Sequence, residues 1–154
     1  FSAVAVVSGT IGGREGPDEP VNRVKLPGWP VTMLIMHGEK DDQVPHLGGR
    51  TAKTAWDRLD LPLADAISFW KKNNQCADKP RRIKIAEGRV LHDVYSCKTG
   101  AELTVYLIRN GGHAWPGEYR PVWRLEYAFL DEPTTDIVAT EEILDFFNRN
   151  QGIE

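Results

Sequence analysis

The chain has 154 residues, of which 41% are hydrophobic and 27% are charged, and this size and composition are typical of a globular protein with one hydrophobic core. Its formal net charge of −3, with no cluster of lysines and arginines, argues against a nucleic-acid-binding surface, because such surfaces need cations to neutralise phosphates. No run approaches about 18 consecutive apolar residues, so we expect no segment that crosses a membrane.

Short apolar runs predict the first strands. Residues 1–9 form such a run, which opens at Phe1 without an initiator Met or a charged leader, so we expect this sequence to begin inside a fold. Residues 9–30 contain five glycines and four prolines, which predicts a solvated surface connection. Residues 31–36 (VTMLIM) are a second buried strand.

Two helices and a hairpin are predicted in the rest of the chain. Pro62 can start a helix that ends near residue 74 and buries the stripe Leu63, Ala66, Ile67 and Trp70. A turn at residues 98–100 joins the strand pattern of 90–97 to the apolar run of 103–108, which we interpret as a hairpin. The last helix is expected to start at residues 134–136, to end near 149–152 and to bury Ala139, Ile143, Phe146 and Phe147.

Two predicted strands lead into loops with residue types used in catalysis. Residues 31–36 are followed by the acidic loop 37–45 (HGEKDDQVP), and residues 103–108 by the loop 111–117 (GGHAWPG). Open α/β sheets place their chemistry in the crevice beyond the carboxyl ends of parallel strands. An acid loop followed by a histidine loop has the chain order of the last two members of a Ser…Asp…His triad in α/β-hydrolases.

The two loops together resemble those of the polyhydroxybutyrate depolymerase and feruloyl esterase group of α/β-hydrolases, the LpqC-like esterases. The similarity rests on His37-Gly-x-x-Asp41-x-x-Val44-Pro45 and, more specifically, on Gly112-His113-x-Trp115-Pro116-Gly117, and it covers most of the chain. It implies an α/β fold that is the carboxyl-terminal part of an α/β-hydrolase sheet, with three parallel strands, a hairpin strand and flanking helices. Residues 1–154 would be a partial domain that lacks the half with the nucleophile elbow.

The resemblance implies a carboxylic ester hydrolase, with Asp41 and His113 as the acid and base of a catalytic triad and no cofactor. Asp42 is a rival to Asp41, but the spacing to Val44-Pro45 favours Asp41, and His37 is expected to be structural. Polyester, feruloyl and acetyl-xylan esters are all candidate substrates. Trp115, Tyr119 and Trp123 fall in an aromatic stretch that could line the substrate pocket or form a packed lid.

The two cysteines, Cys76 and Cys97, allow either a disulfide or two buried thiols, and their spacing does not decide between these. The family resemblance favours the disulfide and a secreted or periplasmic protein. Such a bridge would close a loop of 22 residues (97 − 76 + 1) and contribute about 3 kcal/mol to stability. The strand at Phe1 should pair with the missing half of the fold, so we expect self-association through that edge when the half is absent.

Several alternatives stay open. Ser8, Asp41 and His113 have the right order, but Val6 and Thr10 stand where a nucleophile elbow needs small residues, so we do not expect Ser8 to be the nucleophile. His37, Asp41, His46 and His113 lack the spacing of a helical zinc motif, so we expect no catalytic metal. The chain could also be a noncatalytic binding module that retains half a hydrolase fold, or part of a peptidase of the prolyl oligopeptidase type.

Overall fold

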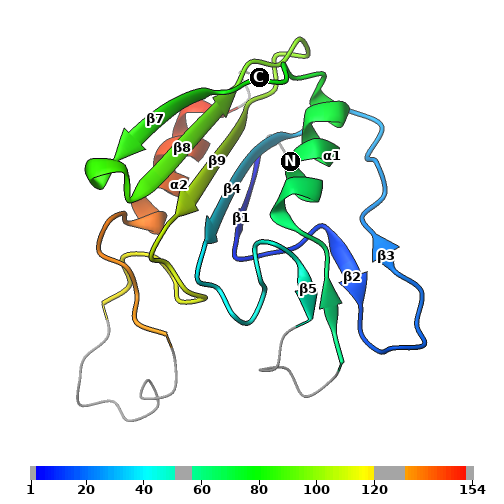
Figure 1. Cartoon of the computed structure of the whole chain (residues 1–154). Coiled ribbons are helices and arrows are strands. Elements are labelled where there is room, and N and C mark those ends of the chain that lie inside the picture. The colour runs from blue at the N-terminus through cyan, green and yellow to red at the C-terminus, as the bar shows by residue number, and fades with distance from the viewer. Residues whose placement is uncertain (1–2, 51–56, 120–130, 152–154) are drawn as a thin grey trace.

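The structure is a computed structural model that describes residues 3–50, 57–119 and 131–151. Its centre is a five-stranded mixed sheet in the order β1-β4-β9-β8-β7 (Figure 1). The parallel strands are β1 (Ala3–Val7), β4 (Thr32–Gly38) and β9 (Leu103–Ile108). β8 (Val90–Tyr95) pairs antiparallel with β9, and β7 (Arg81–Ile85) pairs antiparallel with β8. The fold class is therefore α/β, and the predicted hairpin is present.

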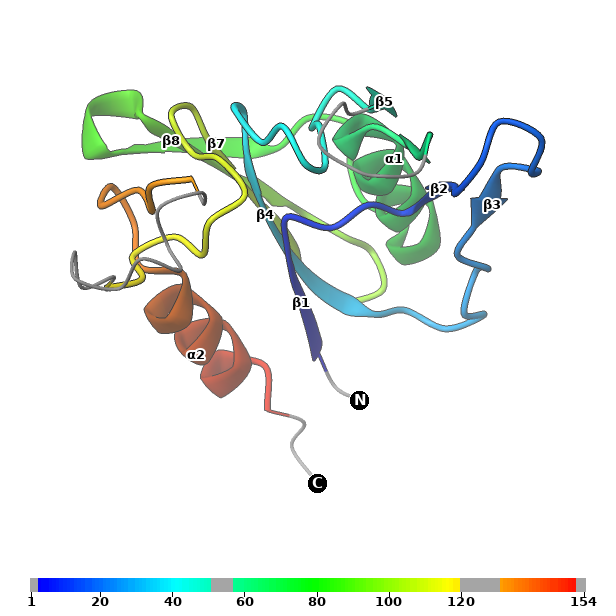
Figure 2. The ribbon, with the colours of Figure 1, turned by 90° about the horizontal axis from the view of Figure 1, so that it is seen from below.

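The two helices cover opposite faces of this sheet (Figure 2). α1 (Leu63–Asn74) packs on one face and α2 (Ala139–Arg149) on the other. Successive side chains of a strand point to opposite faces, so Met33 and Ile35 of β4 face the α1 side, while Leu34 and Met36 face the α2 side. Burial on both faces explains why β4 reads as an unbroken apolar run.

The end of the chain differs from the prediction. α2 begins at Ala139, not at 134–136, and Phe147 is 37% exposed, so it does not belong to the buried stripe. Asp136 is instead held outside the helix, because its carboxylate accepts a hydrogen bond from Arg89 at 2.7 Å and its backbone N–H donates to Thr134 Oγ1. The helix rotates Ala139 and Phe146 toward the sheet and leaves Phe147 at the rim.

The connection after β1 is also more ordered than the loop that its glycines and prolines predict. β2 (Gly12–Arg14) and β3 (Asn22–Arg23) join β5 (Gly49–Arg50) and β6 (Leu59–Asp60) in a second sheet of order β3-β2-β6-β5. A short 3₁₀ turn, η1 (Ala86–Gly88), connects β7 to β8. The short strands escaped prediction because they form only where segments distant in sequence supply a partner.

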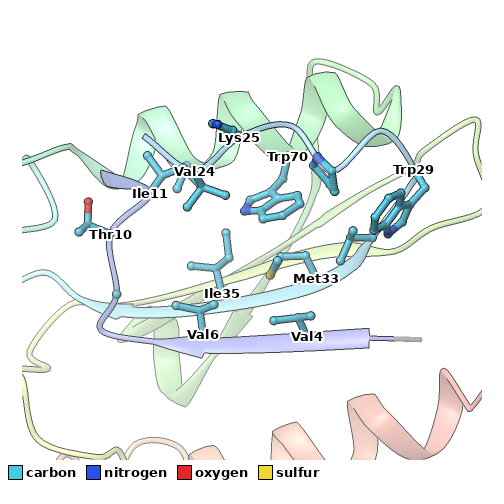
Figure 3. Close-up of a pocket in the computed structure, with 14 residues that line it drawn as sticks. Val4, Val6, Thr10, Ile11, Val24, Lys25, Trp29, Met33, Ile35 and Trp70 are labelled. Carbon is cyan, nitrogen blue, oxygen red and sulfur yellow. The ribbon is translucent and has the colours of Figure 1, made fainter. Parts of the chain in front are cut away.

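An apolar cavity of about 340 Å³ lies between the sheet and α1 (Figure 3). Val4 and Val6 of β1, Met33 and Ile35 of β4 and Trp70 of α1 line its walls, and Trp29, which is 66% exposed, stands at its rim. β1 is the edge strand beside this cavity, and all five of its residues are only half-buried. This edge of the sheet is thus only partly covered.

Cys76 and Cys97 form a disulfide, as the family resemblance predicted. The bridge joins the residue beyond the end of α1 to the turn before β9. Backbone hydrogen bonds flank it on both sides, from Ala77 N–H to Ser96 O at 2.8 Å and from Lys98 N–H to Gln75 O at 3.1 Å. No helix in the described residues is long and apolar enough to cross a membrane.

Candidate active site

The acid loop and the histidine loop meet at the carboxyl ends of β4 and β9. Glu39 N–H donates to Ile108 O at 2.8 Å, and Lys40 N–H donates to Gly111 O at 2.9 Å, so the two loops leave the sheet as hydrogen-bonded neighbours. Gly38 allows this approach, because a Cβ at that position would meet Gly111 O and would lie 2.7 Å from Gly112 O. The pairing of two parallel strands thus converts a sequence separation of 72 residues into direct contact.

Asp41 and His113 form a hydrogen-bonded pair. His113 Nδ1 lies 3.0 Å from Asp41 Oδ2 and 3.2 Å from Oδ1, which are distances at which an Nδ1–H donates to the carboxylate. The Asp41 side chain is fully buried, whereas the His113 side chain is 35% exposed. The structure therefore selects Asp41 over the exposed Asp42 as the partner of the histidine. Since Nδ1 is occupied by Asp41, Nε2 is the nitrogen left for a reacting group.

The backbone of the acid loop keeps the buried Asp41 ionised. Oδ1 accepts hydrogen bonds from the N–H groups of Val44 at 2.8 Å and Gln43 at 3.0 Å. Burial by itself would raise the pKa of this carboxyl group, but the hydrogen bonds from Val44, His113 and Gln43 and the charge of His113 outweigh it and hold the pKa below its usual value. The geometry thus supplies a negative charge beside one nitrogen of His113 at neutral pH.

His37 packs beneath the same loop. Its ring is 2% exposed, and Nε2 lies 2.8 Å from Val44 O and 3.6 Å from Asp41 Oδ2. Burial lowers the pKa of this imidazole, and the hydrogen bond with Val44 and the charge of Asp41 only partly oppose that effect. The sequence predicts a structural role for His37 but no partner for its ring, and in the structure that partner is the carbonyl oxygen of Val44.

A second cavity of about 340 Å³ opens at His113. It lies between the end of β1, the acid loop and the histidine loop, and Ser8, Gln43, Trp115 and Asp131 are among its walls. Ser8 has a left-handed φ of 51° and follows the last residue of β1, and its N–H donates to Met36 O at 2.9 Å. Ser8 therefore shares a cavity with His113, while the ring nitrogen Nδ1 of His113 is bonded to Asp41.

Asp131 also holds the histidine loop. Its Oδ2 accepts a hydrogen bond from the backbone N–H of His113 at 2.9 Å, and a Cβ at Gly112 would lie 2.5 Å from the same oxygen. Gly117 N–H and Ala139 N–H extend this contact by donating to Thr134 O and Pro116 O. Sequence reasoning missed Asp131, because a lone acid 18 residues after the histidine carries no local signal.

The three aromatic residues predicted to bind substrate have different positions. Trp115 lines the cavity at His113, is 41% exposed and donates its indole N–H to Thr140 Oγ1 at 3.1 Å. Tyr119 is 86% exposed and is absent from the lining of that cavity. Trp123 lies outside the described residues. Of the three, only Trp115 is seen beside the histidine.

Within residues 3–50, 57–119 and 131–151, no group of three or more His, Cys, Asp or Glu side chains is arranged to hold a metal ion. His37 and His113 approach the same Asp41 carboxylate, but His37 points its Nε2 at Val44 O and His113 points its Nδ1 at Asp41. The chemistry that this arrangement can support is proton transfer at His113 Nε2, backed by a buried carboxylate.

Comparison with known proteins does not add to this description: neither a scan against protein families nor a search of curated proteins found a match to the chain.

Proposed function

We propose that this chain carries the acid–base half of a serine esterase active site, with His113 as general base and Asp41 as its partner. The observation that supports this most directly is the 3.0 Å contact between His113 Nδ1 and the fully buried, ionised Asp41. A carboxylate in that position fixes the tautomer that leaves Nε2 unprotonated and stabilises the imidazolium that forms during the reaction. The chain would be the carboxyl-terminal part of an α/β-hydrolase domain.

The reaction that follows is acyl transfer. Nε2 of His113 takes the proton of a serine hydroxyl as its oxygen attacks the ester carbonyl carbon, and the imidazolium then returns that proton to the departing alkoxide. A water molecule then attacks the carbonyl carbon of the acyl-serine while Nε2 takes its proton, and the imidazolium returns that proton to the serine oxygen. This step releases the acid and restores the serine. Trp115 beside His113 favours an apolar or aromatic acyl group in the cavity.

The open edge of the sheet supports a serine supplied by polypeptide outside residues 1–154. A strand that paired in parallel with the free edge of β1 would end beside Val7 and Ser8, which border the cavity at His113. A nucleophile elbow at the end of that strand would therefore deliver its serine to the correct cavity. The same polypeptide would supply the backbone donors that stabilise the oxyanion.

The handedness of the crossovers suggests where the following helix would lie. The connection from β1 to β4 and the segment that leads from β4 through α1 to β7 step in one direction across the sheet, and both pass over the α1 face. Crossovers between parallel strands are almost always right-handed, so a preceding unit that steps in the same direction places its helix on this face too. That helix would cover the apolar cavity walled by Val4, Val6 and Trp70 (Figure 3).

The decisive experiment is to assay the longer polypeptide of the same reading frame. We expect it to contain a G-x-S-x-G sequence before Phe1 and to hydrolyse a short-chain nitrophenyl ester. Replacing that serine by Ala, or His113 by Ala, should lower kcat by about 10³-fold or more. Asp41→Asn should lower kcat by about 10²- to 10⁴-fold. Ser8→Ala is the matched control and should retain activity. Absence of the serine sequence, or full activity of His113→Ala, would refute the proposal.

Ser8 gives a second candidate nucleophile, because it has a left-handed φ and faces the same cavity as His113. The assay separates the two: residues 1–154 alone should show no turnover above background, whereas a Ser8 nucleophile predicts turnover that Ser8→Ala abolishes. If neither polypeptide turns over esters, the result would favour a binding role for the Asp41–His113 pair.

A further inference from the structure

We propose that His37 is a positioning residue for the Asp41–His113 pair, acting as a neutral imidazole that holds the acid loop through Val44. The inference deepens the proposed function and rests on it for its catalytic meaning. The evidence for it is geometric: His37 is 2% exposed, and its Nε2 lies 2.8 Å from the carbonyl oxygen of Val44. It is the last but one residue of β4, so the sheet itself places the ring under the loop.

The surroundings of Nε2 determine which nitrogen carries the proton. Val44 O at 2.8 Å and Asp41 Oδ2 at 3.6 Å are both acceptors, so an unprotonated Nε2 would face two like partial charges. A proton on Nε2 instead makes a hydrogen bond to Val44 O and an electrostatic attraction to Asp41. Nδ1 has no hydrogen-bond partner in the described part of the chain and is buried, so a second proton there would have no acceptor.

Val44 connects this histidine to the acid. Its carbonyl oxygen is held by His37 Nε2–H, and its N–H donates to Asp41 Oδ1 at 2.8 Å. Both the N–H and the C=O of Val44 are therefore held in place. Because its N–H holds Asp41 Oδ1, the other carboxylate oxygen, Oδ2, is kept pointing at His113. Substituting His37 by an apolar residue would leave Val44 O without this donor and free the loop to rotate.

Neutrality of His37 matters for the second imidazole. A cationic ring 3.6 Å from Asp41 Oδ2 would compete with His113 for the same negative charge. Burial, which lowers the pKa of His37, keeps the ring uncharged at neutral pH and leaves the carboxylate to His113. His37 therefore orients Asp41, and the negative charge of Asp41 interacts with His113.

The test compares His37→Gln, whose amide N–H can replace Nε2–H, with His37→Leu, which removes the donor at similar size. His92→Gln is the matched control, because His92 is a half-buried histidine whose Nε2 lies 2.6 Å from Thr104 Oγ1, on a strand (β8) that β9 separates from β4. NMR follows the Nδ1–H resonance of His113, which reports its hydrogen bond to Asp41. We expect wild type, His37→Gln and His92→Gln to share this resonance, and His37→Leu to lose or displace it.

A direct measurement needs no variant. The ¹⁵N shifts of His37 in the wild-type chain should show a neutral ring with its proton on Nε2 throughout the neutral range. A proton on Nδ1, a charged ring at neutral pH, or a His37→Leu variant with unchanged His113 signals would overturn the proposal, as would a folded His37→Gln variant that behaves like His37→Leu. None of these readouts involves ester turnover, so they stay informative if the esterase assay fails, and the esterase proposal survives if they fail.

Discussion

Replacing Gly38 by Ala should disrupt the candidate site through a single added methyl group. Gly38 ends β4, and a Cβ there would meet the carbonyl oxygen of Gly111 and lie 2.5 Å from the Gly111 carbonyl carbon. The atoms it meets are backbone atoms of the histidine loop, which no side-chain rotation can move aside. The φ of Gly38 is not in the left-handed region, so the effect of the substitution is one of space alone.

The size of the effect follows from the distances. Real Cβ atoms essentially never approach a heavy atom closer than 3.0 Å, and the Gly111 carbonyl oxygen lies even nearer to this Cβ than the carbonyl carbon at 2.5 Å, so the loops must separate by more than 0.5 Å (3.0 − 2.5). The same movement would stretch the 3.0 Å contact between Asp41 Oδ2 and His113 Nδ1 beyond about 3.5 Å, where a hydrogen bond is lost. Overpacking of this kind costs about 1–3 kcal/mol, and we expect the upper end because backbone must shift.

The assay combines stability with a local probe. Thermal unfolding should show a Tm lowered by about 6–12 °C for a loss of about 3 kcal/mol in a domain of this size. NMR should show that the His113 Nδ1–H resonance is lost or displaced. Gly16→Ala is the matched control, because the nearest atom to its Cβ would be a Glu19 side-chain carbon at 4.0 Å and its φ is not left-handed. That variant should be neutral or slightly stabilised.

A Gly38→Ala protein with the Tm of Gly16→Ala and an unchanged His113 signal would refute this reasoning. It would mean that the acid and histidine loops do not touch at Gly38 and Gly111, and that the contact between Asp41 and His113 depends on something else. A lowered Tm with an intact His113 signal would refute only the link between the loop separation and the hydrogen bond.

Further predictions concern stability. Replacing Cys76 and Cys97 by Ala should lower the free energy of unfolding by about 3 kcal/mol, measured in urea with the reduced wild type as control, and an unchanged midpoint would contradict it. Tyr106→Phe removes a buried O–H donor 2.7 Å from Glu142 Oε2 and should cost about 1.5–3 kcal/mol, whereas no loss would mean that this bond forms only weakly. Burial lowers the pKa of His37 and His92 below the ordinary 6.5, so the unfolded chain binds protons at a higher pH than the folded chain does. The free energy of unfolding should therefore fall as the pH drops below about 6.5. A His92→Gln variant with the same acid sensitivity as wild type would contradict the contribution of that residue.

Much of the core could be predicted from the sequence, because burial on both faces leaves a local mark. β4 and β9 are continuous apolar runs, and α1 has its apolar residues at helical spacing, so their positions follow from the solvent preference of each residue. Parallel pairing of the two strands then implied that the loops after them would meet, and the contact of Asp41 with His113 has that geometry.

Other elements depended on partners that no local pattern contains. β7 was not predicted, since Arg81, Arg82 and Lys84 leave only Ile83 and Ile85 to mark it, and it becomes a strand by pairing with β8. The small sheet forms because Gly12–Arg14 meets Leu59–Asp60 across a long loop. α2 begins at Ala139, later than predicted, because Arg89, from another part of the chain, donates a hydrogen bond to the carboxylate of Asp136 and holds it outside the helix.

The candidate site divides in the same way. Which residue types follow each strand is a property of the order of the amino acids, and it was enough to nominate Asp41 and His113. The groups that hold that pair are Val44 and His37 at the acid loop and Asp131 at the histidine loop, and only the folded chain brings them there. Apolar burial acts residue by residue and so can be read along the chain, whereas a hydrogen bond needs two groups at a set distance and angle, which only the packed structure provides.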